Sequence, residues 1–159
     1  MGGRRATSRT NNSTTNLLSK AKVTRQNYYE ENGIKYVEDK HNVVFEHSQN
    51  NVDNAYKLSE FLGEKVILIP RVNNPSGIQT PDYLVKNERW DNKKVNGASS
   101  SAFYTRARTK RKQADNFIFD ITESKIKMKG AQQQVANLRR QLKWVKRIIV
   151  IKGKCIVEI

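Results

Sequence analysis

The chain has 159 residues, enough for one domain with a modest core and a tail. Its formal net charge is +15 and its pI is about 10.1. This excess of positive charge implies a polyanionic partner, most simply nucleic acid and less simply an anionic membrane. A membrane span needs roughly 18 consecutive apolar residues, and no run in the sequence approaches that length. The N-terminus also lacks the apolar segment of a signal peptide.

Cysteine and histidine are too scarce for the common zinc sites. Cys155 is the single cysteine, so no internal disulfide forms, and His41 and His47 are the only histidines. A structural zinc ion takes about four such ligands. We therefore expect both histidines to be ordinary surface or half-buried residues.

The first 26 residues differ in composition from the rest of the chain. They are rich in Ser, Thr, Asn, Arg and Lys, carry six basic residues and contain no acid. Such a segment has little apolar surface to bury. We predict a basic, disordered arm over residues 1–26 and a single domain over residues 27–159, with its core in residues 51–159.

Hydrophobic patterns predict the elements of this domain in chain order. Short strands are expected at 34–37 and 43–45, followed by a helix over 51–63 that Asn51 or Asp53 caps. The later elements are a buried strand over 65–69, a β-hairpin over 82–93, a basic helix over 102–116, a strand over 117–121, an amphipathic helix over 131–145, and strands over 147–151 and 154–159. This order predicts an α/β fold with a mixed central sheet flanked by helices.

The hairpin is the most informative of these elements. Its arms alternate in hydrophobicity, and Asn87-Glu88 is predicted to form a two-residue loop, which pairs Asp82 with Lys93. Side chains return to the same face of a strand every second residue. The pattern therefore places Asp82, Asp91 and Lys93 on one face, with Asn92 on the other.

Two carboxylates and a lysine on one face suit metal-assisted phosphodiester cleavage. Mg²⁺ prefers a few carboxylate oxygens together with water and substrate phosphate. The ion polarises the phosphoryl oxygen and helps to generate a hydroxide-like nucleophile. A neighbouring lysine positions that water or offsets charge on the phosphate. The alternative is a surface hairpin whose Asp91 and Lys93 are merely solvated.

Basic residues gather on two of the predicted helices. Clusters of this kind hold phosphates, and the resulting affinity falls steeply with salt. The alternative is that both clusters are solvated helix faces. The candidate nucleic-acid-binding residues are Arg106, Arg108, Arg111 and Lys112 on the first helix and Arg139, Arg140 and Lys143 on the second.

Several motifs resemble a known family. Pro81-Asp82 followed by Asp91-Asn92-Lys93, on a hairpin between helices and strands, resembles the PD-(D/E)xK nuclease superfamily. A closer resemblance, over about residues 43–159, is to the CdiA C-terminal tRNA nuclease domains, the toxin tips of contact-dependent inhibition systems. The segments that carry it are 61–63, 66–70, 77–83, 89–91 and 112–117.

The resemblance implies roles for individual residues. Asp82 and Asp91 would bind a Mg²⁺ or Mn²⁺ ion, and Lys93 would be the catalytic lysine. In some members a lysine from the following helix completes the site, which points to Lys110, and Gln113 is a further candidate from the same helix.

The chain also departs from the family pattern. The family often adds an acid from the helix before the hairpin, and Glu60 and Asp53 both remain candidates for that role. Asn-Gly is the usual hairpin loop, whereas Asn87-Glu88 stands here. Asn92 occupies a position where an apolar residue is expected, so we expect it to weaken packing on its face of the sheet.

The function implied by the resemblance is a metal-dependent ribonuclease that cleaves tRNA. It would belong to a contact-dependent inhibition toxin or to a related secreted or phage-borne protein, and would act in a bacterial cytoplasm. Its expected partners are tRNA and an acidic immunity protein that covers the basic groove. Two alternatives stay open: a DNA endonuclease on the same scaffold, and a non-catalytic nucleic-acid-binding or phage structural protein with a relic nuclease fold.

Overall fold

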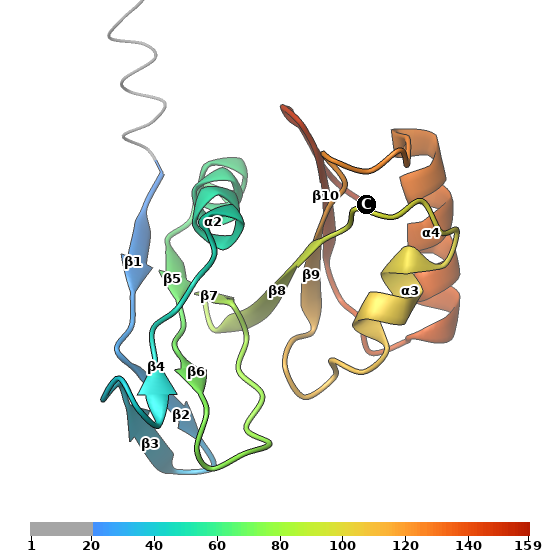
Figure 1. Ribbon diagram of the computed structural model, residues 1–159. Coiled ribbons are helices and arrows are strands. Elements are labelled where there is room, and N and C mark those ends of the chain that lie inside the picture. Colours follow the sequence, from blue (N-terminus) through green and yellow to red (C-terminus); the bar gives the residue numbers. More distant parts are fainter. Residues whose placement is uncertain (1–20) are drawn as a thin grey trace, which may run out of the picture.

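The computed structural model describes residues 21–159, and its centre is a seven-stranded mixed sheet (Figure 1). The strand order is β1-β5-β7-β8-β9-β10-β11. β1 is parallel to β5, and β8, β9 and β10 are parallel to one another, whereas the other neighbours are antiparallel. The strands are β1 (Val23–Arg25), β5 (Val66–Leu68), β7 (Tyr83–Val85), β8 (Glu88–Lys94), β9 (Asn116–Asp120), β10 (Ile148–Lys152) and β11 (Cys155–Glu158).

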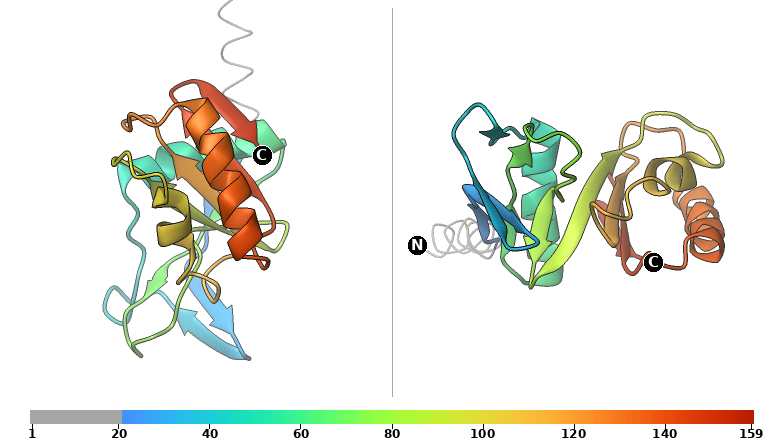
Figure 2. Two further views of the ribbon diagram at one scale, coloured as in Figure 1. Left: turned by 90° about the vertical axis from the view of Figure 1, so that its right-hand side faces the viewer. Right: turned by 90° about the horizontal axis from the view of Figure 1, so that it is seen from below.

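Helices cover both faces of the sheet, as Figure 2 shows from two directions. α2 (Gln49–Leu62) packs Ala55 and Leu58 against one face, where Trp90 and Ile118 are fully buried. α3 (Ala102–Ala107) and α4 (Met128–Gln141) cover the other face beside β9 and β10. The predicted class, a mixed central sheet flanked by helices, is confirmed.

Two small sheets extend one end of the domain. β2 (Tyr28–Glu31) pairs with β3 (Ile34–Val37), and β4 (Val43–Val44) pairs with β6 (Arg71–Val72), both antiparallel. They enclose a third apolar cluster, formed by Tyr29, Val43, Ile69 and Val72. The predicted strands at 34–37 and 43–45 correspond to β3 and β4, whereas β1, β2 and β6 were not predicted.

The hairpin turn differs from the prediction. Lys86 and Asn87, not Asn87 and Glu88, form the loop, with φ of 49° and 65°, and Glu88 already pairs with Val85. Two positive φ values are typical of the type I′ turn, which matches the twist of the flanking strands. The register moves by two residues on β8, so Leu84 pairs with Arg89. A shift of two leaves every side chain on its predicted face.

The first predicted helix begins earlier than expected. α2 starts at Gln49, and the hydroxyl of Ser48 accepts a hydrogen bond from the backbone N–H of Asn51 at 3.2 Å. Ser48 is therefore the N-cap, and the predicted caps Asn51 and Asp53 lie inside the helix. Gly63 ends the helix in the left-handed conformation, φ 70°, as predicted.

The basic helix predicted over 102–116 is much shorter in the structure. α3 ends at Ala107, and residues 108–115 continue as turns before β9. Five cations among residues 106–112 repel one another at helical spacing, which disfavours continuation of the helix. α4 likewise ends at Gln141 rather than at 145, although Val145 is buried as its spacing predicted.

The predicted arm also extends too far. Val23–Arg25 form β1, which pairs with β5 at the edge of the central sheet, so the boundary at residue 26 is wrong. The rest of the predicted arm, residues 1–20, lies outside the described residues. Among residues 21–159, no helix combines the length and apolar character that crossing a bilayer requires.

Candidate active site

Asp82, Asp91 and Lys93 meet where strands β7 and β8 separate. Asp82 directly precedes β7, and its backbone N–H donates to the carbonyl of Trp90 at 3.0 Å. Further along β8, the backbone N–H of Asn92 bonds to a side chain instead of to a backbone carbonyl. It donates to Asp82 Oδ2 at 2.8 Å. The carboxylate is thus fixed against β8, beside Asp91.

The two carboxyl groups form a tight acidic pair. Burial, a hydrogen bond with Asp91 and the negative charge of Asp91 together raise the pKa of Asp82 well above its usual range. Asp91 is 1% exposed, and its Oδ2 lies 2.8 Å from Lys93 Nζ. This contact has ion-pair distance but not hydrogen-bond geometry, so Oδ2 accepts no hydrogen bond from the described residues.

The turn after α3 adds a neutral side chain to the acidic pair. Gln113 Nε2 donates to Asp91 Oδ1 at 3.2 Å, in agreement with the prediction that Gln113 faces the site. Lys110, the other candidate from this segment, is half-buried. Within residues 21–159 it forms no ion pair, so the structure does not join it to the acidic pair.

Asn92 was expected to weaken packing, and the structure corrects this. Its Nδ2 donates to Asn50 Oδ1 at 3.0 Å and to Asn51 Oδ1 at 2.7 Å, and its Oδ1 accepts from Asn54 Nδ2 at 3.0 Å. Asn51 Nδ2 in turn donates to Asp82 Oδ1 at 3.3 Å. A buried amide whose hydrogen bonds are made costs little. We call Asn50, Asn51, Asn54 and Asn92 the asparagine network.

The asparagine network ends at a further acid, Asp120 at the end of β9. Its Oδ2 accepts from Asn54 Nδ2 at 2.9 Å and from Asn50 Nδ2 at 3.1 Å, and its Oδ1 accepts from the N–H of Thr122 at 3.0 Å. Although burial raises it, the hydrogen bonds from Thr122, Asn54 and Asn50 lower the pKa of Asp120 overall. Asp120 is therefore a stable carboxylate on the α2 side of the sheet.

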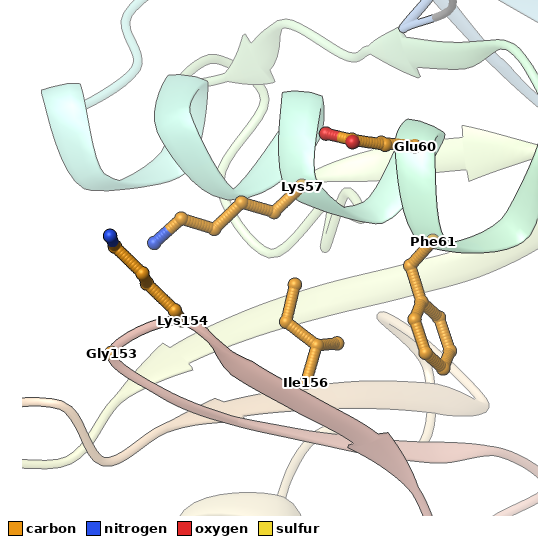
Figure 3. A pocket seen from close by; sticks show the side chains of 6 residues that line it. All are labelled: Lys57, Glu60, Phe61, Gly153, Lys154 and Ile156. Carbon is orange, nitrogen blue, oxygen red and sulfur yellow. The ribbon is translucent and has the colours of Figure 1, made fainter. Parts of the chain in front are cut away.

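The helix before the hairpin contributes asparagine rather than an acid. Successive residues of a helix are about 100° apart, which places Glu60 and Asp53 on the side of α2 opposite Asn51. Asp53 is exposed and accepts from Gln49 at 2.8 Å. Glu60 lines a pocket of about 720 Å³ between α2 and the β10–β11 hairpin, beside Lys57 (Figure 3). Neither candidate for the family's helix acid lies at the acidic pair.

The predicted phosphate-binding residues fall into two kinds. Arg106, Arg108, Arg111 and Lys112 are exposed around the C-terminal end of α3. Arg139 instead stabilises the fold, because its guanidinium donates to the carbonyls of Lys146 at 3.0 Å and Ile159 at 2.7 Å. The exposed cations of the second cluster are Arg140 and Lys143.

The acidic pair has the chemistry of a small divalent-cation site. Carboxylate oxygens are the ligands that Mg²⁺ prefers, and Asp91 Oδ2, buried 2.8 Å from Lys93 Nζ, accepts no hydrogen bond from residues 21–159. A cation between two carboxyl groups also relieves the repulsion that raises the pKa of Asp82. Among residues 21–159, no three acidic, cysteine or histidine side chains gather to hold a metal. Asp82 and Asp91 alone would supply the charged ligands.

Sequence reasoning overlooked the asparagine network, although a signal was present. Asn50 and Asn54 are four residues apart on α2, and Asn54 directly precedes Ala55, which with Leu58 defines the inner side of the helix. Amides at (i, i+4) beside a buried stripe indicate a polar contact on the packed side of a helix. Position 92 supplies the partner, since its predicted face is the one that α2 covers.

Comparison with known proteins supports the resemblance seen in the sequence. Residues 79–156 match the family model described as the contact-dependent growth inhibition CdiA C-terminal domain. The matched segment contains the acidic pair, Lys93 and Gln113. The predicted recognition of a CdiA C-terminal domain is confirmed over these residues.

A solved structure has a similar fold. It is a CdiA-CT/CdiI toxin and immunity complex from Burkholderia pseudomallei. The similarity has a TM-score of 0.54 at 21% sequence identity, and it covers 69% of this chain and 81% of that chain. Comparison with curated proteins gives no match.

Proposed function

We propose that this chain, whose residues 79–156 match the CdiA C-terminal domain family, is a metal-dependent ribonuclease toxin that cleaves tRNA. The observation that carries the proposal is the acidic pair, in which Asp82 and Asp91 meet beside Lys93. A structural ion pair would need only one acid, whereas a buried pair of carboxyl groups is costly unless a cation joins it.

Each residue of the site has a role in this proposal. Asp82 and Asp91 would hold one Mg²⁺ or Mn²⁺ ion, which when bound supplies Lewis-acid activation of the phosphate and of water. Lys93 is 18% exposed and reaches solvent from the buried Asp91, so its ammonium group can contact a substrate oxygen. There it would offset the charge that develops on the phosphate. Gln113 and Asn51 keep the two carboxylates in place.

The net charge supports a nucleic acid as the substrate. The formal net charge of the chain is +15. Four exposed cations lie around the end of α3, in the segment that also supplies Gln113. Phosphates held there would lie close to the acidic pair. Cations placed in this way recognise the backbone of a folded RNA without reading its bases.

The experiment is a cleavage assay on purified total bacterial tRNA and on plasmid DNA, each with Mg²⁺ or with EDTA. Discrete tRNA fragments should appear with Mg²⁺ and should disappear with EDTA, with Asp82→Ala and with Lys93→Ala. Asp53→Ala, which removes an exposed acid from the opposite side of α2, should cleave like the wild type.

The same assay separates the alternatives. Cleavage of plasmid DNA alone would identify a DNA endonuclease on the same scaffold. Binding of nucleic acid without cleavage of either polymer, unchanged in Asp82→Ala and Lys93→Ala, would identify a non-catalytic binding protein.

We also propose an immunity protein as a partner. The similar solved structure is a toxin and immunity complex, and a producer of an RNA-cleaving toxin needs such protection. Because the surface around α3 is basic, the partner should be acidic and should cover the exposed cations. Delivery into a bacterial cytoplasm, where tRNA is found, completes the proposal. Co-expression with the acidic product of a neighbouring gene should yield a stable complex that does not cleave tRNA.

A further inference from the structure

A pocket beside the acidic pair has no role in the proposed chemistry. It has a volume of about 300 Å³ and lies between the β2–β3 hairpin and strands β7 and β8. We call it the tyrosine pocket. Its lining includes Gln26, Tyr28, Tyr29, Glu30, Pro81 and Arg89.

The tyrosine pocket and the acidic pair are connected through neighbouring residues of the chain. Pro81, in its wall, is joined directly to Asp82. Arg89, also in its wall, lies two residues before Asp91 on β8, so both side chains are on the same face. A nucleic-acid strand whose phosphate lay at the acidic pair would have a neighbouring nucleotide near this pocket.

The lining suits a flat, uncharged group. Tyr28 and Tyr29 are both in the lining, and Ile69, Pro81 and Leu84 add apolar residues to it. Tyr29 is buried in the third apolar cluster, so Tyr28 is the tyrosine available to a ligand. Bound ligands generally occupy pockets of about 300 to 1,000 Å³, so this pocket suits a single base or nucleoside.

Charges in the lining argue against a phosphate. Arg89 is the lining's one cation among the described residues, and it is already paired with Asp115 at 3.1 Å and with the carbonyl of Lys112 at 2.7 Å. Glu30 contributes a negative charge to the same lining. With its cation neutralised and an acid present, the pocket attracts no anion.

Two features prepare the pocket for stacking and for edge recognition. Lys35 Nζ lies 4.2 Å from the ring centroid of Tyr28, a cation–π contact that holds the ring from one face. Gln26 donates from Nε2 to the carbonyl of Tyr28 at 2.9 Å, and its Oε1 remains an acceptor for a base edge.

We propose that the tyrosine pocket binds one unpaired nucleobase of the RNA strand that is cleaved at the acidic pair. The proposal rests on the proposed ribonuclease function. Proteins that recognise single-stranded RNA splay out bases and stack them on aromatic side chains. The enzyme would accordingly require an unpaired nucleotide beside the cleaved bond.

The test measures RNA binding separately from cleavage. Binding of a fluorescently labelled single-stranded oligoribonucleotide is followed by anisotropy in EDTA, with the full chain. Stacking of one base corresponds to a change of about 5- to 150-fold in Kd. Tyr28→Ala should raise Kd at least about fivefold, whereas Tyr28→Phe, which keeps the ring, should bind within about twofold of the wild type.

Control variants and a second ligand make the result specific. Tyr56→Ala removes a tyrosine that is 48% exposed on α2, outside the pocket, and should leave Kd unchanged. If Tyr28→Ala fails to fold, Tyr28→Leu takes its place. It keeps apolar bulk without the aromatic face and should also raise Kd at least about fivefold. A fully paired RNA should bind all variants equally.

The outcomes separate this inference from the ribonuclease proposal. If the wild type cleaves tRNA but Tyr28→Ala binds and cleaves as the wild type does, the tyrosine pocket is overturned and the ribonuclease stands. If the wild type cleaves no RNA but Tyr28→Ala loses single-strand binding, the pocket stands as a base-binding site. An equal loss in Tyr56→Ala, or no binding by the wild type, would also overturn it.

Discussion

Asn92 connects strand β8 to three asparagines of α2. Because Asn92 is buried, water cannot replace these hydrogen-bond partners. Replacing it with an apolar residue of similar size removes the donor for Asn50 and Asn51 and one acceptor for Asn54. Buried polar groups left without a partner cost about 1 to 3 kcal/mol each. Asn92 therefore stabilises the fold at a position where the sequence pattern favours an apolar side chain.

We predict that Asn92→Leu lowers the free energy of unfolding by about 1 to 3 kcal/mol. Urea denaturation followed by tryptophan fluorescence measures this change. Asn96→Leu is the matched control: Asn96 is exposed, and the substitution should change stability by less than about 0.5 kcal/mol. A variant Asn92→Leu as stable as the wild type would show that the asparagine network is not needed for folding.

The lowered pKa of Asp120 predicts that the stability of the fold depends on pH. Its pKa is lower in the folded protein than in the unfolded chain, so the unfolded chain binds the proton more readily. The stabilisation is therefore complete above the unfolded pKa of about 3.9 and is lost as pH falls through the folded pKa.

The test compares the wild type with Asp120→Asn in urea denaturation between pH 7 and pH 3. At pH 7 the variant should be less stable by about 1 to 3 kcal/mol, as expected for hydrogen bonds to a charged group. The difference should shrink as the solution becomes more acidic. A difference that stays constant over the whole range contradicts the role given to this carboxylate.

At the scale of elements, the β7–β8 hairpin determines which side chains reach the site. Its loop, Lys86-Asn87, places two non-glycine residues at positive φ, a conformation that glycine and asparagine adopt most readily. Lys86 also forms an ion pair with Glu64 at 2.7 Å, but its side chain is 67% exposed, so the pair contributes little.

We predict that the double variant Lys86→Asn, Asn87→Gly raises the free energy of unfolding by about 0.5 to 1 kcal/mol, because Asn-Gly is favoured in a type I′ turn. Glu88→Gly tests the register. Glu88 is a strand residue here, so this variant should lose about 0.5 to 1 kcal/mol. If Glu88→Gly stabilised the protein instead, the loop would have to lie at Asn87-Glu88.

The elements also show what can be predicted from a sequence. The strands over 117–121 and 147–151 and the end of α2 at Gly63 were predicted within one residue, because each has a strong local signal. The hairpin register was missed by two residues, since a lysine at positive φ carries no such signal. Even so, the shared face of Asp82, Asp91 and Lys93 was predicted, because an even shift preserves it.

Other features depend on contacts between distant segments. β1 is only three residues long and pairs with β5, more than forty positions along the chain, so no local pattern marks it. The asparagine network likewise joins α2 to β8 and β9. Family resemblance suggested an acid on α2, and the structure places Asn51 beside Asp82 instead. Such differences from the family pattern depend on contacts between distant segments, so they become visible only in the folded structure.

At the scale of the whole molecule, positive charge governs the proposed interaction with RNA. Arg108 and Arg111 are exposed in the turn that leads to Gln113, and within residues 21–159 neither forms an ion pair. Each cation that contacts a phosphate contributes about 0.7 to 0.9 to the slope of log K against log salt concentration.

We predict that Arg108→Ala with Arg111→Ala reduces this slope by about 1.4 to 1.8 when tRNA binding is measured between 50 and 300 mM salt in EDTA. Lys40→Ala with Lys154→Ala makes the same change in charge at exposed positions outside this turn and should reduce the slope less. Equal effects of the two double variants would mean that net charge, rather than the cluster after α3, determines binding.

We propose that Asp82 and Asp91 together hold a divalent cation. Calorimetric titration of Mn²⁺ into the protein near pH 7.5 tests it most directly, with Asp91→Asn and Asp53→Asn titrated in parallel. We predict weak, saturable binding of one ion to the wild type and to Asp53→Asn, and no binding to a folded Asp91→Asn. Equal binding by Asp91→Asn and the wild type, or no binding by any of the three, would contradict it.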